Sequence, residues 1–348
     1  MNGEPQRRIE DVRSESSEDR EHVARLSRAL GALEARLRAI EGKSQDRRDQ
    51  TLYTAQSAGR LAALGESLDV AARRIAVLQP AHAGDTSCAA ATGVSAAGNG
   101  APESGDWAGA DDAAFLAGVV TTIPGFLDDY AARRTMELLA YQEAAGIRGS
   151  LLEVGVFYGR YLSILLRSAL RTGDPIAALD TFEIVGAPLV ELMMRPLAAG
   201  RVTYVQQASR TISAGEIAQV LGTASRFISI DGSHAAEDAL WDLGLAQELI
   251  APEGVIAVDD FLNPVTPGVN EAVHRFFAEP RRVVPFAYTA NKLFLCPAGR
   301  AATYRGVFEN AVIADTGDPR SETFRASLPH LRQLVEQTLW GQPLLIVP

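Results

Sequence analysis

An alternation of short apolar runs with helical patterns dominates residues 109–297, and it constrains the fold more than any other feature. Helical stretches such as Tyr161–Arg171 and Ala235–Ile250 separate the runs. The five runs that we interpret as strands are Leu151–Val156, Ile176–Asp180, Val202–Gln206, Phe227–Asp231 and Val255–Asp259. Such an alternation predicts an α/β domain, in which helices cover both faces of a parallel sheet.

Two further apolar runs, Arg282–Phe286 and Lys292–Cys296, follow with only five residues between them. Because five residues cannot form a crossover helix, we expect this pair to be antiparallel. Pro285 fits the first run only at an edge or a bulge. Residues 298–348 form a C-terminal extension with a predicted helix over Leu328–Leu339 and an apolar tail over Pro343–Pro348, and the sequence assigns them no role.

Apolar residues in the N-terminal part of the chain repeat with the alternating spacing of three and four that is typical of a coiled coil, which we assign to residues 8–80. The two runs are Val23, Leu26, Leu30, Leu33, Leu37 and Ile40, and Leu61, Leu64, Leu68, Ala71, Ile75 and Leu78. Their phases differ, so either one long helix carries a stutter or the chain forms a helical hairpin. A leucine seam needs a partner, which predicts a homo-oligomer.

Residues 81–108 are rich in Ala, Gly, Ser and Thr and are predicted to be a flexible linker. The net charge of −10 argues against a general nucleic-acid binder. The two cysteines, Cys88 and Cys296, do not suggest a disulfide framework. This cysteine pattern fits a reducing cytoplasm, where we expect the protein to lie. We see neither a secretory signal nor an apolar run long enough to span a membrane.

A glycine-containing turn follows the first predicted strand, in the segment Glu153–Gly159. In open α/β sheets, ligands bind at the carboxyl ends of the strands, and the following helix offers free N–H groups. We expect Glu153, Gly155, Tyr158 and Gly159 to contribute to a cofactor site, with Glu153 facing a cationic group. The turn lacks the G-x-G-x-x-G spacing that a dinucleotide pyrophosphate prefers, although it does not by itself exclude a nicotinamide cofactor.

Two residues after later strands are candidates for the same site. Asp180 closes the second strand, where its carboxylate would accept hydrogen bonds from ribose hydroxyls. Ser209 follows the third strand and would either line the adenine or ribose pocket or form the N-cap of a helix over Ile212–Leu221.

Three carboxylates follow the fourth and fifth strands: Asp231 closes one, and Asp259 and Asp260 close the next. Carboxylates brought so close repel one another unless a cation is bound, and oxygen ligands suit Mg²⁺. His234, three residues after Asp231, is then the candidate general base for an acceptor hydroxyl.

Residues near this cluster have less certain roles. Asp260 is either a ligand or a residue that orients a neighbour. Asn263 is either a further ligand or part of a turn beside Pro264. Glu271 and His274 are interpreted as residues on the exposed face of the next helix, although Glu271 could still reach the pocket.

The segments Ile230–His234 and Pro252–Phe261 resemble the metal-dependent sugar O-methyltransferases, which include macrocin-type and rhamnosyl enzymes. The resemblance covers roughly residues 120–297. It implies a class I, Rossmann-like sheet of five parallel strands and an antiparallel hairpin, the cofactor S-adenosylmethionine (SAM), Mg²⁺ at Asp231, Asp259 and Asp260, and a base at His234. Catechol-type enzymes share this layout but carry lysine at the position of His234.

The leading hypothesis is therefore a SAM-dependent, Mg²⁺-assisted O-methyltransferase acting on a sugar or glycan hydroxyl. An O-methyltransferase for a phenolic or other small natural product is one alternative. A coiled-coil scaffold of a glycan-synthesis complex, in which methyl transfer is secondary, is another. The coiled coil is not part of the pattern that the resemblance covers, so assembly and acceptor are the less constrained inferences.

Overall fold

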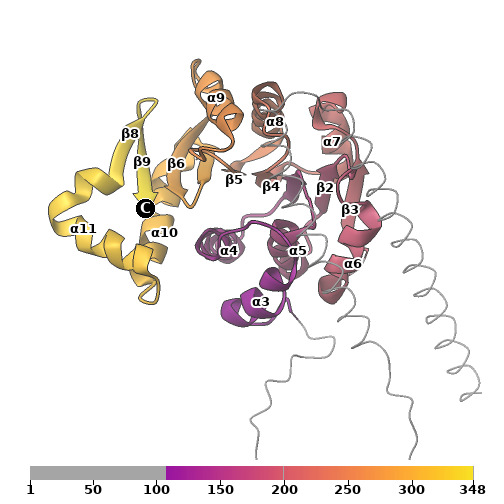
Figure 1. Ribbon diagram of the computed structural model, residues 1–348, viewed down its shortest axis with the longest axis horizontal. Helices are drawn as coiled ribbons and strands as arrows, with labels where there is room; N and C mark the ends of the chain where they lie inside the picture. The colour runs from indigo at the N-terminus through magenta and orange to yellow at the C-terminus, as the bar shows by residue number, and fades with distance from the viewer. Residues whose placement is uncertain (1–106, 199, 348) are drawn as a thin grey trace, which may run out of the picture. The chain divides into compact units, whose positions relative to one another are not determined.

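One mixed sheet of nine strands organises the part of the chain that the structure describes, residues 107–198 and 200–347 of a computed structural model (Figure 1). The strand order is β3-β2-β1-β4-β5-β7-β6-β9-β8. The strands are β1 Ser150–Val154, β2 Ile176–Asp180, β3 Val202–Gln206, β4 Ser225–Ile230, β5 Ile250–Val258, β6 Val283–Thr289, β7 Lys292–Pro297, β8 Glu336–Leu339 and β9 Gln342–Val347. The predicted coiled coil and most of the predicted linker lie outside the described residues.

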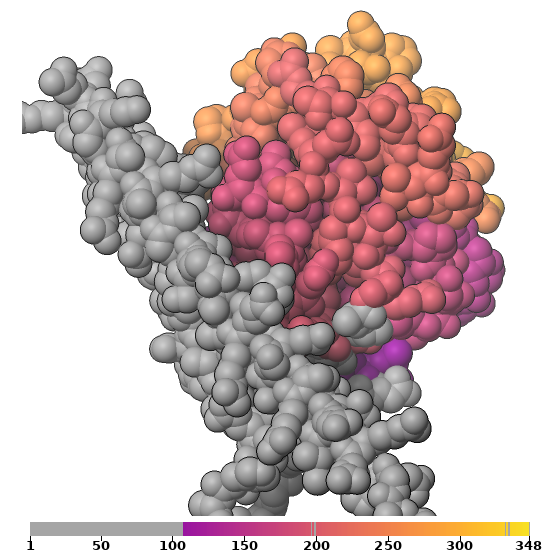
Figure 2. Space-filling model, turned by 90° about the vertical axis from the view of Figure 1, so that its right-hand side faces the viewer, coloured from indigo at the N-terminus to yellow at the C-terminus, as the bar shows by residue number. Residues whose placement is uncertain are grey.

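Helices cover both faces of this sheet, as the alternation predicted (Figure 1). One face packs against α3 Asp112–Gly118, α4 Asp129–Ala144, α5 Arg160–Thr172, α6 Ala187–Ala198, α10 Ala301–Ala314 and α11 Pro319–Val335. The other packs against α7 Ala214–Leu221, α8 Ala236–Leu249 and α9 Pro267–Phe276. Short 3-10 turns are η1 Val120–Thr122, η2 Ser209–Thr211 and η3 Ala298–Arg300. Figure 2 views the molecule from the β3 edge, where α6 and α7 form much of the coloured surface.

The Rossmann-like α/β prediction is confirmed. Strands β1 to β5 are mutually parallel, and the strand order reverses between β1 and β4. The β6–β7 pair is antiparallel, and its register shifts at Pro285, so the proline occupies a bulge as expected. The point of reversal places the carboxyl ends of β1, β4 and β5 side by side, which is where ligands bind in such sheets.

The C-terminal extension is more closely integrated than the sequence suggested. The predicted helix over Leu328–Leu339 is wrong in its bounds: α11 begins at Pro319, capped by the Asp318 side chain, and its last predicted residues form β8. Pro329 lies inside α11. The apolar tail is β9, which pairs with β6 in parallel and with β8 in antiparallel fashion.

The last two residues of the predicted linker belong to the folded domain. Arg167 Nε donates to the Trp107 carbonyl at 3.1 Å, and Arg171 Nε donates to the Ala108 carbonyl at 2.7 Å. The Trp107 ring also packs directly over Gly118. Cys296 is buried and free, whereas Cys88 lies outside the described residues. Among the described helices, none is long and apolar enough to cross a membrane.

Candidate active site

The turn between β1 and α5 needs glycine for two physical reasons. Gly155 and Gly159 have φ values of 80° and 83°, which side chains with a Cβ rarely adopt. A Cβ on Gly155 would lie 2.0 Å from the carbonyl oxygen of Asp231, so the close approach is to the end of β4. The glycine turn therefore packs directly against Asp231, the first of the predicted metal-binding carboxylates, at the carboxyl ends of the strands.

Asp180 braces this turn from the end of β2. Its Oδ2 accepts hydrogen bonds from the N–H groups of Val156 at 2.6 Å and Phe157 at 3.3 Å, and its Oδ1 accepts from Phe182 N–H at 2.6 Å. Phe157 and Phe182 both have positive φ, a strained conformation that often marks a functional loop. The predicted contact of Asp180 with a ribose stays a prediction, since these N–H groups already use much of the carboxylate.

The other predicted cofactor residues differ in accessibility. Glu153 is only 1% exposed, and burial, followed by the charge of Asp231, raises the pKa of its carboxyl well above the ordinary value. Its Oε2 is buried without a hydrogen-bond partner among the described residues. Tyr158 is buried and packs edge-on against Phe157.

Ser209 does not cap the helix that follows it. It begins the turn η2, and α7 is capped instead by Ser213, whose side chain and that of Glu216 form a reciprocal capping box. The Ser209 carbonyl accepts a hydrogen bond from Trp241 Nε1 at 2.9 Å. The N-cap alternative for Ser209 is therefore wrong, and its place in the cofactor pocket stays a prediction.

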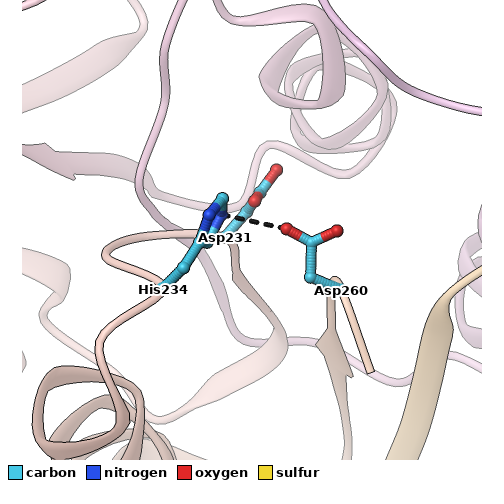
Figure 3. Close-up of side chains that lie close together, drawn as sticks. All are labelled: Asp231, His234 and Asp260. Carbon is cyan, nitrogen blue, oxygen red and sulfur yellow. Dashed lines mark ion pairs between the residues drawn. The ribbon is translucent and has the colours of Figure 1, made fainter. Parts of the chain in front are cut away.

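Asp231, His234 and Asp260 come together at the carboxyl ends of β4 and β5 (Figure 3). One ligand atom from each lies within 4.8 Å of the others. His234 Nε2 is 2.9 Å from Asp260 Oδ2, and this hydrogen bond raises the pKa of His234 above its ordinary value. Burial by itself would raise the pKa of Asp260, but hydrogen bonds from His234 and Asn263 outweigh it and lower that pKa. The histidine and this carboxylate therefore form an oriented pair.

Asp259 has a different partner, which the sequence analysis missed. Its Oδ2 lies 2.8 Å from Nζ of Lys292, the first residue of β7, and its Oδ1 accepts the N–H of Asp260. Lys292 is 2% exposed and lies 4.4 Å from the centre of the Tyr161 ring. Burial would lower the pKa of Lys292, but the charge of Asp259 outweighs it and raises that pKa. The sequence signal for this partner was a lysine, Lys292, at the first position of an apolar strand.

The pKa of Asp231 responds to charged residues of both pairs, Asp259 and Lys292 of one and Asp260 of the other. Burial, followed by the charge of Asp259, raises the pKa of Asp231 well above the ordinary value, and Lys292 opposes this rise. A small cavity of about 10 Å³ is lined by Asp231, His234 and Asp259, among others. That volume is about what a single water-sized group requires.

The loop after β5 holds Asp260 by several hydrogen bonds. Asn263 Nδ2 donates to Asp260 Oδ1 at 2.6 Å, while its Oδ1 accepts from Val265 N–H within a turn. Asn263 thus supports Asp260 and also fits the predicted turn. Glu271 and His274 are exposed on α9, as expected.

The segment that contains this site is similar to a known protein family. Residues 152–261 match a family described as a methyltransferase domain. The chain carries a methyltransferase domain. The match begins inside β1 of this methyltransferase domain and ends just after Asp260, so it spans the glycine turn and the acidic cluster. No curated protein matches the chain.

Solved structures similar to the methyltransferase domain include three O-methyltransferases. CalS11, a TDP-rhamnose 3'-O-methyltransferase of calicheamicin biosynthesis, is 20% identical with a TM-score of 0.38, covering 49% of this chain and 81% of its own. NovP is 13% identical with a TM-score of 0.41, covering 48% and 80%. An enzyme from Bacillus cereus, solved in complex with SAH, is 18% identical with a TM-score of 0.40, covering 50% and 84%.

Proposed function

We propose that this protein is a SAM-dependent O-methyltransferase that methylates a sugar or glycan hydroxyl with the assistance of Mg²⁺. The observation that carries the proposal is the convergence of Asp231, His234 and Asp260 at the rim of a methyltransferase domain, next to the glycine turn.

SAM is the cofactor that the glycine turn supports best. The turn between Gly155 and Gly159 opens onto the N-terminus of α5, whose free N–H groups suit a carboxylate. Glu153 lies near the end of β1, and its buried Oε2, which has no hydrogen-bond partner among the described residues, would favour a cationic group. Asp180 borders the same turn and retains acceptor capacity for a hydroxyl.

A divalent cation fits the donor atoms at the rim. Asp231 and Asp260 offer two carboxylates whose oxygens lie within 4.8 Å of each other and of a His234 nitrogen. Asp259, which we also expect to be a ligand, would do so through Oδ1, because Oδ2 is paired with Lys292. A bound Mg²⁺ would polarise the acceptor hydroxyl and thereby lower its pKa.

His234 is suited to remove the proton from that hydroxyl. If Nε2–H donates to Asp260 Oδ2, Nδ1 is left as the proton acceptor. Asp260 then fixes the ring and stabilises the imidazolium that forms, much as a carboxylate does in other His–Asp pairs. SAM, when bound, would supply the methyl group: the hydroxyl oxygen would bond to the methyl carbon as the bond from that carbon to the sulfonium sulfur breaks and the sulfur keeps the electron pair.

The choice of a sugar acceptor rests on the resemblance of residues 230–234 and 252–261 to the sugar O-methyltransferases. The test is transfer of a labelled methyl group from SAM to rhamnosyl and other glycosides and to catechols, each with Mg²⁺ or with a chelator. We expect labelled glycoside only with Mg²⁺. Labelled catechol without labelled glycoside would favour the phenolic alternative.

We further propose that residues 8–80 assemble the protein into a homo-oligomer. The support is the leucine seam alone, since those residues lie outside the described part of the chain. Light scattering should give a multiple of the chain mass for the full chain and a monomer for a chain lacking residues 1–80. Equal masses per particle would contradict the assignment. Retained methyl transfer in the shortened chain would assign the coiled coil to assembly.

A further inference from the structure

The C-terminal hairpin β8–β9 ends in a two-residue turn with an unusual residue. Leu339 pairs with Gln342, so Trp340 and Gly341 form the turn, and their φ values are 51° and 73°. A turn with positive φ at both positions favours Asn-Gly, because a large side chain is strained in this conformation. Trp340 is therefore kept here against the local backbone preference.

The ring of Trp340 packs into an aromatic cluster around Phe261. It stacks on Phe277 with ring centres 4.5 Å apart and contacts His274 at 5.2 Å and Phe261 at 6.0 Å. Tyr288 of β6 approaches Phe261 at 6.0 Å from another side. Phe261 itself is 1% exposed. The hairpin turn thus completes the enclosure of this one side chain.

Phe261 directly follows the two carboxylates of the site, Asp259 and Asp260. Its N–H donates to the Asn291 carbonyl at 3.0 Å, and Asn291 immediately precedes Lys292, the partner of Asp259. Asp260 has a φ of 61°, so the backbone on the N-terminal side of Phe261 is also strained. Because the Phe261 ring is buried and its N–H is hydrogen-bonded, we expect it to restrict where the preceding carboxylates, Asp259 and Asp260, can lie.

We propose that Trp340 is a positioning residue, through which the C-terminal extension holds the Asp259–Asp260 loop in its working geometry. The inference rests on the proposed function only for the chemistry of these carboxylates. It assigns a role to the β8–β9 hairpin of the C-terminal extension, because the Trp340 ring contacts Phe261 although the two strands lie at the far edge of the sheet. Strain at Asp260, Asn291 and Trp340, three positions that meet at Phe261, is typical of loops held in place for function.

The variant W340N separates this role from simple stability. Asn-Gly is the preferred sequence for the turn, so W340N keeps the hairpin while it removes the ring. W340F retains an aromatic ring at the same position. L345A is the matched control, because Leu345 is fully buried in the same hairpin but packs into the core on the opposite face of the sheet.

Three measurements on the full chain decide the matter: hydrogen exchange of the Phe261 and Leu262 amides, Mn²⁺ affinity by electron paramagnetic resonance, and thermal melting. For W340N we expect faster exchange of both amides and about 10-fold weaker Mn²⁺ binding, with little loss of melting temperature. W340F should stay close to wild type. L345A should melt earlier without selective loosening of this loop.

Wild-type exchange and Mn²⁺ affinity in W340N would overturn the proposal, as would an L345A protein with the same loop changes as W340N. If the wild-type protein binds no Mn²⁺, the metal part of the proposed function fails, and the exchange comparison alone still decides the role of Trp340.

Discussion

Lys292 Nζ lies 2.8 Å from Asp259 Oδ2, and the pair joins the first residue of β7 to the carboxylate that follows β5. Both side chains are largely or fully removed from solvent, at 2% and 19% exposure. Antiparallel pairing of β5 with β7 brings the start of β7 to the carboxyl end of β5, so the topology itself places a cation among the acids. The charge of this lysine opposes the rise in the pKa of Glu153 and Asp231, and so favours their charged forms.

Replacing Lys292 with Met should destabilise the protein, because it leaves Asp259 without its cation. Breaking a buried pair by removing one partner costs about 3–5 kcal/mol. The double variant K292M/D259N should recover much of that loss, which a double-mutant cycle from urea unfolding would measure. A K292M protein as stable as wild type, or no recovery in the double variant, would contradict the pairing.

Replacing Gly155 with Ala should disrupt the rim. The new Cβ would meet the Asp231 carbonyl oxygen at 2.0 Å in addition to the strain of positive φ. Gly146 is the matched control, because its φ is also positive but nothing lies within 4 Å of the position of its Cβ. We expect G146A to lose about 1 kcal/mol and G155A clearly more, together with its SAM affinity. Equal losses would show that the close approach to β4 is unimportant.

The core of the fold could be predicted from the sequence because each strand of the parallel sheet is a short apolar run between helices. Predictions for β2 and β3 match the observed bounds, and the antiparallel β6–β7 hairpin followed from a loop too short to cross over. The rim carboxylates followed from the same logic, since strand ends collect ligands. The sequence pattern was sufficient to predict those strands and side chains whose position depends on residues nearby in sequence.

Features that depend on long-range packing could not be predicted in this way. Lys292 is 33 positions from Asp259 in sequence, and only the pairing of β7 with β5 reveals that they meet. The helix assignment over Leu328–Leu339 failed because residues 336–339 become a strand only by pairing with β9. Ser213 rather than Ser209 caps α7 because the capping box needs Glu216 three residues on, a signal present in the sequence but not used.

Replacing His234 with Gln should abolish most of the methyl transfer. Loss of a general base typically lowers kcat about 10²- to 10⁴-fold. SAM affinity should be unchanged, and Mn²⁺ affinity should change little if His234 acts as the base. S233A serves as the neighbouring control. Wild-type turnover in H234Q would contradict the base assignment, and a loss of Mn²⁺ affinity with the turnover would assign His234 to the cation.

Asp242 should make stability depend on pH. This residue is buried on α8, and burial raises the pKa of its carboxyl from 3.8 to about 6. Between these two values the folded state binds more protons than the unfolded state, so the free energy of unfolding falls as pH rises through this window. The penalty is complete above about pH 6.

The variant D242N should lose this dependence. The free energy of unfolding of D242N minus that of wild type should be about 2 kcal/mol larger near pH 7.5 than near pH 4, because the variant lacks the cost of a buried charge at the higher pH. Urea titrations at the two pH values measure the difference, with E248Q as control because Glu248 is exposed on the same helix. Parallel pH profiles for D242N and wild type would contradict the raised pKa.

We propose above all that a divalent cation held by the carboxylates beside His234 assists methyl transfer from SAM to a hydroxyl. The most direct measurement is the rate of labelled methyl transfer by chelator-treated protein as Mg²⁺ is added back, for wild type and D260N. We predict that wild-type activity rises and saturates with Mg²⁺, whereas D260N needs far more Mg²⁺ and stays slower. Full activity of the wild-type protein in chelator would contradict the account.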